Sequence, residues 1–368
     1  ILNVKKVYDK IIKTKKEYGS IMKNKKKLCF NLIVFTAIIS ITFYIIFKDK
    51  SIADILQIIS SAKKKYILIA IMSMCLYFVC DAINLGRTLK ALGEKSNFIK
   101  NIKYVLIGFF FSSITPAASG GQPMQVYYMN KEKISVGNST LALLINLTAM
   151  QIVTISTALI SVAFCHKYLS SFLIWFFVIG ILLNSSALVL LIVSISSRRM
   201  TNWLIKVLIK ILRFLKIKNI EDKKQKIEEQ LDKYQGGAKY IRENRRVIVR
   251  TLITAYIQYL LYYSISYWVY RSFGYNESNI LKIIALQSIL YGTVSGIPSP
   301  GAIGVTEGGY LEIFKNVYSS DIISEAMLLN RGINFYLFLV ISAIITIVCT
   351  INDGKAMKKE NEIEEKQT

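Results

Sequence analysis

Histidine is almost absent from this chain, because His166 is the only one among its 368 residues. One histidine is too few for the metal sites and catalytic triads that are built on this side chain. The cysteines are odd in number, lie in or beside apolar stretches and do not have the spacing of metal ligands or of a disulfide framework. We therefore expect free thiols, no metal and no cofactor. The stretch G-x-x-x-x-G-K-[S/T] is also missing, so the sequence does not predict a P-loop nucleotide site.

Acidic residues are about half as frequent as basic ones, with 23 Asp and Glu against 47 Lys and Arg and a net charge of +24. A soluble protein with this charge would be expected to bind nucleic acid. Here the positive charge is concentrated beside apolar segments, with ten lysines in residues 1–27 and sixteen Lys and Arg against six Asp and Glu in residues 198–250. The positive-inside rule assigns both segments to the cytoplasm, and anionic lipid head groups account for the charge. We therefore predict no nucleic-acid partner.

Long hydrophobic runs are what the chain has in abundance. Hydrophobic residues make up 53% of it and the mean hydropathy is +0.42, more than a soluble domain usually has. Several runs reach the roughly 20 residues needed to cross a hydrocarbon core of ~30 Å. The clearest are Leu28–Phe47, Tyr66–Leu85, Thr140–Phe164, Phe172–Ile195, Leu252–Tyr270 and Ile333–Ile351. The sequence predicts an all-α, polytopic helix bundle with about six full spans in the cell (cytoplasmic) membrane.

If the N-terminus is cytoplasmic, the order of the spans predicts on which side of the membrane each later loop lies. The basic residues 1–27 are too many for the start of a cleavable signal, and residues 353–368 return to the cytoplasm as a charged tail. The five lysines of loop 48–65 fit this layout poorly, because the loop should be external. In the basic cytoplasmic loop 198–250, the apolar residues of 199–218 share one face, which predicts an interfacial helix. The residues that follow are expected to form a short solvated helix.

Aromatic side chains near the ends of the predicted spans are typical of the belt at a membrane interface. The tyrosines expected in this belt are Tyr127, Tyr128, Tyr262, Tyr263, Tyr267 and Tyr270.

Two stretches, residues 104–129 and 279–318, do not fit the pattern of full spans. Each has an apolar arm, a cluster rich in Pro, Gly and Ser, and a second arm, and every arm is too short to span. They contain all four prolines of the chain, which are Pro116, Pro123, Pro298 and Pro300. Proline breaks helices, and irregular backbone at membrane depth is tolerated only where protein or a water-filled cavity surrounds it. We predict that both stretches are re-entrant or broken helices.

The two clusters are related in sequence. P-x-x-S-G-G-Q at 116–122 resembles P-G-x-x-G-x-x-E-G-G at 300–309, and the first prolines of the two motifs lie 184 residues apart, half the chain. In the layout above, the first cluster enters the membrane from the cytoplasm and the second from outside. This predicts an inverted repeat, with residues 28–197 and 251–352 as its halves and a substrate site near the midplane. Two unrelated loops between spans are the alternative.

The motif pair resembles the flippase-like transmembrane region of the lysylphosphatidylglycerol synthases and their stand-alone homologues. A Pro-x-x-x-Gly-Gly-[Glu/Gln]-Pro signature begins at Pro116, and a Pro-Gly-x-x-Gly-x-x-Glu-Gly-Gly signature begins at Pro300. The match covers roughly residues 28–352. The resemblance implies movement of lipids between leaflets, since the full-length synthases translocate aminoacylated phosphatidylglycerol.

Two departures from the family pattern limit what the resemblance implies. Many relatives carry an acidic residue where this chain has Gln122 and a basic one where it has Gln125, so a charge pair on the first arm is missing. Full-length synthases also append an aminoacyltransferase domain, whereas a short charged tail follows the last predicted span here. We therefore expect no lysyltransferase activity from this chain itself.

A charged side chain in the predicted membrane region costs at least ~2.5–3.5 kcal/mol on insertion scales, so each one needs a reason, and three are weighed. Glu307 either caps its own helix, with Thr306 as the N-cap, or binds a proton, a cation or a cationic head group. Asp81 either pairs with Arg87 or with a neighbouring helix, or belongs to the site. Arg331 is expected to snorkel to the interface, with contact to a lipid phosphate as the alternative.

The predicted substrate-binding set combines the two clusters with the isolated charges. Backbone N–H groups of residues 119–121 would cradle a phosphate, or the glycines there let helices approach closely. The set is Pro116, Ser119, Gly120, Gly121, Gln122, Pro300, Gly301, Gly304, Glu307, Gly308, Asp81 and Arg331. No catalytic or metal-binding residue is predicted.

The function predicted from these observations is a lipid translocator. Its substrate is an anionic or lysylated phosphatidylglycerol, or a polyprenyl phosphate, whose head group passes a polar groove while the acyl chains stay in lipid. The alternative is the membrane subunit of a phosphatidylglycerol lysyltransferase that acts with a separate soluble aminoacyltransferase docked on loop 198–250. A non-transporting scaffold is the third interpretation, and all three are compatible with a homo-oligomer.

Overall fold

The computed structural model describes residues 57, 59–115, 118–196, 220–297 and 299–351. Contacts divide the chain into two units, Ile1–Asp49 and Lys50–Thr368, and all described residues belong to the second unit. The predicted span Leu28–Phe47, the interfacial helix 199–218 and the tail 353–368 therefore lie outside the described residues.

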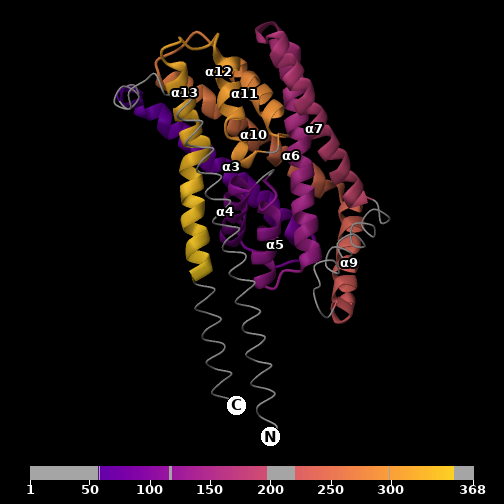
Figure 1. Cartoon of the computed structure of the whole chain (residues 1–368). Helices are drawn as coiled ribbons and strands as arrows, with labels where there is room; N and C mark the ends of the chain where they lie inside the picture. Colours follow the sequence, from indigo (N-terminus) through magenta and orange to yellow (C-terminus); the bar gives the residue numbers. More distant parts are fainter. Residues whose placement is uncertain (1–56, 58, 116–117, 197–219, 298, 352–368) are drawn as a thin grey trace. The chain divides into compact units, whose positions relative to one another are not determined.

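The described residues fold into helices joined by short connections (Figure 1). In chain order these are α3 (Lys64–Ala91), α4 (Phe98–Ile114), α5 (Gly121–Lys131), α6 (Val136–Cys165), η2 (His166–Tyr168), α7 (Ser171–Ser196), α9 (Ile220–Glu243), α10 (Arg245–Ser272), α11 (Ile280–Val294), η3 (Pro300–Ala302), α12 (Val305–Phe314), α13 (Ile323–Arg331) and the π-helical segment η4 (Gly332–Tyr336). The helix of α13 and η4 continues to Ile351. The prediction of an all-α fold is confirmed.

Among the described residues, four helices are long and apolar enough to cross a membrane. These are Lys64–Ala91, Val136–Cys165, Leu173–Ile195 and Ile323–Ile351. Their outward faces carry large apolar side chains that are more than half exposed, such as Leu68, Trp175, Leu182 and Ile344. Such apolar faces are stable in contact with lipid and not with water. A helix can lie in lipid because it satisfies its backbone hydrogen bonds internally. The prediction of a membrane helix bundle is confirmed.

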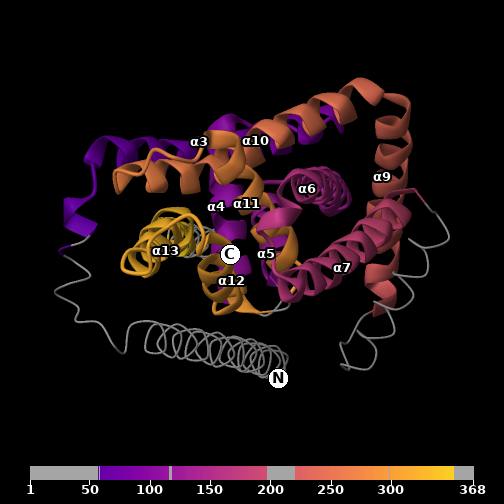
Figure 2. The same ribbon diagram turned by 90° about the horizontal axis from the view of Figure 1, so that it is seen from above.

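Helix α10 contains the predicted span Leu252–Tyr270 but is not among these four helices. It lies beside α3, as the view from above shows (Figure 2). Asn84 Nδ2 donates to Thr251 O at 3.2 Å near one end of the pair, and Lys63 N donates to Ser272 O at 2.8 Å near the other. Burial against α3 explains why α10 carries polar residues that a lipid-facing helix would not tolerate.

Three helices begin at a side-chain cap that the sequence supplies. Asn97, Ser135 and Asn279 precede α4, α6 and α11, and each accepts a hydrogen bond from the backbone N–H three residues later. These bonds satisfy donors that have no partner in the first turn of a helix. The caps fix where the arms that lead to the two proline-rich clusters begin, at α4 and at α11.

The chain of helices is interrupted at both clusters. Between α4 and α5, Thr115 Oγ1 donates to Phe111 O at 2.6 Å and accepts from Gly120 N at 2.9 Å. Ala118 has a φ of 52° in this first break, and Ala302 has the same φ in the second break, between α11 and α12. Left-handed backbone costs a non-glycine residue about 1–3 kcal/mol, and such positions cluster at functional sites.

The residues from Ile220 onward form a longer and more buried helix than the sequence predicts. Helix α9 has 24 residues, and its Tyr234 and Ala238 are buried against Leu141 of α6. Gln230 Oε1 accepts from Gly137 N at 3.0 Å. The expectation of a solvated helix was wrong, because apolar side chains on one face of α9 pack on α6.

The tyrosine belt was also predicted wrongly in part. Tyr128, Tyr263 and Tyr270 are 5%, 0% and 1% exposed, so protein surrounds them. Tyr127, by contrast, is 49% exposed. The ring of Tyr263 packs against that of Tyr259, with centroids 5.7 Å apart. Helix α10 therefore carries a tyrosine cluster in the interior of the bundle.

Candidate functional site

A cavity of about 380 Å³ lies between the helices of the bundle. Its lining includes residues of α3, α4, α5, α6, α10, α11, α12 and the segment from Arg331 to Phe335. Both breaks reach it, the first through Ala118 and the second through residues 295–297, 299, 301 and 302. The two predicted clusters, far apart in sequence, thus meet at one space that polar and apolar side chains line together.

Asp81 lines the cavity from α3. The predicted pair with Arg87 is not formed, because Arg87 Nη1 donates to Asn84 Oδ1 at 2.6 Å and Nη2 donates to Thr254 Oγ1 at 3.0 Å. Asp81 forms no hydrogen bond or ion pair with any residue that the structure describes. An unpaired carboxylate inside a membrane-spanning helix is costly, and such residues typically bind a substrate, an ion or a proton.

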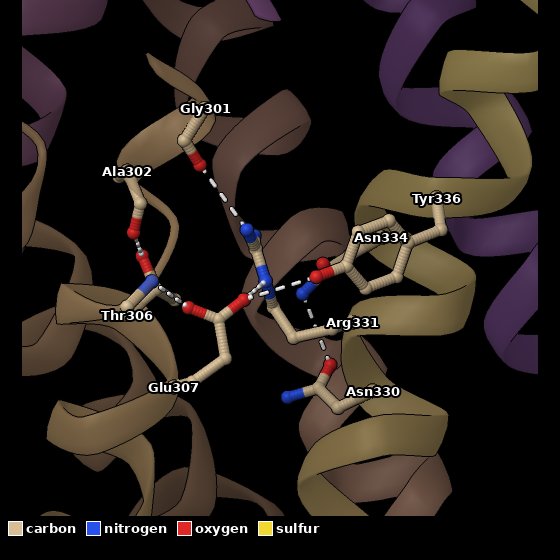
Figure 3. Close-up of polar contacts among 9 residues, drawn as sticks. Gly301, Ala302, Thr306, Glu307, Asn330, Arg331, Asn334 and Tyr336 are labelled. Atoms are coloured by element: carbon tan, nitrogen blue, oxygen red, sulfur yellow. Dashed lines mark hydrogen bonds and ion pairs between the residues drawn. The ribbon is translucent and has the colours of Figure 1, made fainter. Parts of the chain in front are cut away.

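Glu307 and Arg331 form a buried ion pair, with side chains 1% and 5% exposed (Figure 3). Arg331 Nε lies 2.7 Å from Glu307 Oε1, and the Tyr336 hydroxyl donates to the same oxygen at 3.4 Å. Glu307 Oε2 accepts from Gly304 N at 2.7 Å, while Arg331 Nη2 donates to Gly301 O at 3.1 Å. The pair ties the second break to the helix that contains η4.

Two expectations about these charges were wrong in detail. The N-cap of α12 is Gly304 and not Thr306, whose Oγ1 donates to Ala302 O at 2.8 Å. Arg331 does not snorkel, because it is 4% exposed and lines the cavity. Its partner Glu307 lies 24 positions earlier, on another helix, so spacing along the last helix could not reveal it.

The glycines of the first cluster serve packing. Gly120 N is already bound to Thr115 Oγ1 at 2.9 Å. A Cβ at Gly121 would collide with the Ser112 side chain of α4, so this glycine permits close approach of α5. Ser119 is exposed and does not line the cavity. The alternative in which the glycines let helices approach is therefore the better description of 120 and 121.

The glycines of the second cluster, residues 300–309, contribute more directly to the cavity. Gly301 has a φ of 59° and lines the cavity, and a Cβ there would collide with the Phe335 ring. Gly304 has a φ of 84° at the start of α12, whereas a Cβ at Gly308 would meet no atom within 4 Å. Pro300 opens η3, and Pro116 lies outside the described residues. Asp81, Gln122, Gly301 and Arg331 thus line the cavity, with Glu307 joined to it through Arg331.

Several polar cavity residues were missed by the sequence reasoning. Asn146 of α6 and Asn334 of η4 line the cavity, together with Gln287 of α11. The Oδ1 atoms of both asparagines are buried without a hydrogen-bond partner among the described residues, as is Ser299 Oγ in the second break. The signal was available, because amide side chains inside apolar runs are uncommon and face protein or polar cavities.

A second charged group lies outside the membrane-spanning segments. Glu132 follows α5 and forms ion pairs with Lys103 and with Lys100, whose Nζ lies 2.7 Å from Oε2. Burial alone would raise the pKa of the Glu132 carboxyl, but the two lysine ammonium groups beside it outweigh burial and lower the pKa below its ordinary value. These contacts join the start of α4 to the end of α5.

The fold and the cavity define a membrane-embedded helical bundle with interrupted helices around an internal cavity that contains charged and amide side chains. The family model described as the lysylphosphatidylglycerol synthase TM region matches residues 31–342. The chain belongs to this family. It is also similar to the UPF0104 membrane protein PH1989 of Pyrococcus horikoshii, with 22% identity over 305 residues that cover 79% of this chain and 89% of that protein.

Proposed function

We propose that the protein translocates lipids between leaflets and that the cavity receives the lipid head group. The observation that carries this proposal is the cavity itself, because both helix breaks, Asp81 and Arg331 line one space. Broken helices that meet around a polar site are the arrangement on which many transporters depend. Membership of a family of lysylphosphatidylglycerol synthase membrane regions agrees with a phospholipid partner.

The size of the cavity supports a head group as its occupant. Its volume of about 380 Å³ lies near the lower end of the ~300–1,000 Å³ range of ligand pockets. This space suits a polar head group of a phospholipid, whereas two long acyl chains would have to remain outside it. Apolar side chains exposed on the outer faces of the helices provide a surface along which such chains could stay in lipid.

The two charges of the lining favour one of the candidate lipids. Asp81 is unpaired and attracts a cation, whereas Arg331 carries more N–H donors than its bonds to Glu307 and Gly301 use. Ser299 Oγ and Asn334 Oδ1 add buried polar atoms without a partner among the described residues. A head group with both an ammonium and a phosphate satisfies more of these groups than phosphate alone. We therefore place aminoacylated phosphatidylglycerol first, before phosphatidylglycerol and polyprenyl phosphate.

The experiment that tests this function is translocation in liposomes with the purified protein. Fluorescent analogues of the three lipids are placed in one leaflet, and the rate of their appearance in the other is compared with protein-free liposomes. We expect faster translocation with the protein, and the largest acceleration for the aminoacylated lipid. No acceleration for any of the three lipids would contradict the proposed function.

A matched pair of variants tests the role of the cavity carboxylate. We expect Asp81→Asn to lose the preference for the aminoacylated lipid, because the ammonium loses its counter-charge. Asp321→Asn is the control, since Asp321 is exposed in the connection between α12 and α13 and does not line the cavity. Equal translocation rates of the two variants for every lipid would show that Asp81 does not bind the head group.

A further inference from the structure

We propose that a hydrated proton path runs between α3, α6 and α10, from the beginning of α6 to Asp81. It rests on buried polar atoms that have no hydrogen-bond partner among the described residues. These atoms are Ser139 Oγ, Asn146 Oδ1, Thr251 Oγ1, Gln258 Nε2 and Gln258 Oε1. Buried polar groups almost always have a partner in native proteins, and where no protein atom is present an ordered water takes that place.

The side chains concerned are among the most buried polar groups of the residues that the structure describes. Ser139 and Gln258 are 0% exposed, Thr251 is 1% exposed and Asn146 is 5% exposed. Gln258 is the clearest case, because neither its donor nor its acceptor is satisfied by any described residue. A single unsatisfied group would be a local defect, but a set on adjoining helices needs one explanation.

Their spacing places them on single faces of helices. Ser139 and Asn146 are seven residues apart on α6, and Thr251 and Gln258 are seven apart on α10. Seven residues are about two turns of an α-helix, so both members of each pair share a face. On helix α3, Asp81 and the buried Thr88 are also seven residues apart. Asn84 lies between them on the same face of the helix. The three helices contact one another pairwise.

The contacts between the helices set the order along the path. Near the start of α6, Ser135 N and Asn138 Nδ2 donate to Glu94 Oε1, which places a carboxylate at the entrance. Asn84 Nδ2 donates to Thr251 O at 3.2 Å, so these residues lie at one level further in. Asn146 lines the same cavity as Asp81, where the path ends.

Asp81 is the group suited to receive the proton. It is the cavity carboxylate without an ion pair, whereas Glu307 is bound to Arg331 and Gly304. The cavity lining contributed by α4, α5 and α6 contains no titratable side chain. The titratable and charged groups around Asp81 are Tyr77, Cys80 and Arg87 on α3, Tyr259 and Tyr262 on α10, Tyr291 on α11 and Arg331 across the cavity.

The consequence for transport rests on the proposed function. When a proton from the water chain binds the Asp81 carboxylate, the charge of the cavity becomes less negative by one. An ammonium head group is then held less strongly and leaves, and loss of the proton to the same chain restores the site. Proton binding and binding of a cationic head group at Asp81 are therefore mutually exclusive. The pH on the side from which the path enters would therefore set how often the site is free to bind a cationic head group.

The path itself is tested without any lipid transport. After a rapid drop in pH, time-resolved infrared spectroscopy of the purified protein follows the carboxyl band of Asp81, which Asp81→Asn identifies. We expect Thr251→Val and Gln258→Leu to slow the appearance of this band several-fold. Removing a polar group that bonds only to water leaves no protein atom without its hydrogen bond, so both variants should remain folded. Thr346→Val is the matched control, because Thr346 is also buried, at 5% exposed, but donates to Ser342 O of its own helix.

Equal rates of protonation in the wild type, Thr251→Val and Gln258→Leu would overturn the path. A second measurement connects it to function, with a pH-sensitive dye inside liposomes that also carry labelled lipid. We expect an imposed pH gradient to change the translocation rate several-fold in the wild type and in Thr346→Val but not in Thr251→Val. If the translocation rate of the wild type does not change with the pH gradient, the competition between proton and lipid at Asp81 is overturned and the proposed function stands. Slowed protonation in Thr251→Val, without translocation by any form, would support the path and contradict the function.

Discussion

Two of the partners of Glu307, Gly304 and Arg331, differ greatly in what they contribute to stability. Its bond to Gly304 N caps α12, an interaction worth about 0.3–1 kcal/mol at a helix end. Its pair with Arg331 is buried on both sides, and removing one member of such a pair costs about 3–5 kcal/mol because a charge is left uncompensated. The sequence supported the first role and could not reveal the second.

We predict that Glu307→Gln lowers the free energy of unfolding by about 3–5 kcal/mol. Glu312→Gln on the same helix is the control, since Glu312 pairs with Lys315 at the surface and exposed pairs contribute up to about 1 kcal/mol. Denaturant unfolding in detergent measures both. A loss of equal size in the two variants would show that Arg331 does not depend on Glu307.

Glu132 gives a prediction for pH. Because its folded pKa is lowered, the ionised carboxylate stabilises the fold above its unfolded pKa, near the ordinary value of 4.5. This contribution is lost as the pH falls through the lowered folded pKa. The side chain is 22% exposed, so we expect no more than about 1 kcal/mol. The stability difference between the wild type and Glu132→Gln should therefore be positive at neutral pH and vanish in acid. A difference that grows in acid would contradict the assignment.

At the scale of elements, glycines decide how closely two helices can pack. A Cβ at Gly180 of α7 would collide with the backbone of Thr293 in α11, which cannot move aside as a side chain can. A Cβ at Gly308 of α12 would meet no atom within 4 Å. Identical substitutions at these two glycines should therefore act in opposite directions.

We predict that Gly180→Ala destabilises the protein by about 1–3 kcal/mol through overpacking. Gly308→Ala should stabilise it by about 0.5–1 kcal/mol, because alanine is the better residue inside a helix. Thermal unfolding of both variants in the same detergent tests the pair. If Gly180→Ala were the more stable of the two, the close contact of α7 with α11 would be wrong.

The elements that could be predicted are those that composition and periodicity define alone. Apolar runs gave the positions of α3, α6 and α7, and proline with glycine gave the interruptions at 115–120 and 295–304. The residues that line the cavity were harder to predict, because an amide inside an apolar run, such as Asn334, marks a polar or buried position but does not say which cavity it faces. Tyrosines were misassigned because a belt and a buried cluster have the same spacing along α10. Burial of α9 depends on its contact with α6, because the apolar face of α9 does not by itself say which surface covers it.

The inverted arrangement is a property of the whole molecule and remains a prediction. In Figure 1, α5 lies near the lower end of the bundle and α12 near the upper end, as opposite entry of the two broken helices requires. Cysteine substitutions at Ser119 and Ser299 test the arrangement in a background without native cysteines. We predict that a membrane-impermeant thiol reagent reaches Ser119→Cys from the cytoplasm and Ser299→Cys from outside. Labelling of both from one side would contradict the inverted repeat.

Head-group passage through the cavity is the central claim, and filling the cavity tests it most directly. Gln122 lines the cavity from the first turn of α5, whereas Tyr127 of the same helix is 49% exposed. The measurement is the translocation rate of fluorescent aminoacylated phosphatidylglycerol in liposomes with Gln122→Trp or Tyr127→Trp, after both variants are shown to insert and remain folded. We predict that Gln122→Trp reduces the rate to that of protein-free liposomes and that Tyr127→Trp keeps the wild-type rate. Wild-type translocation by Gln122→Trp would contradict the account, because the head group would then not pass through this cavity.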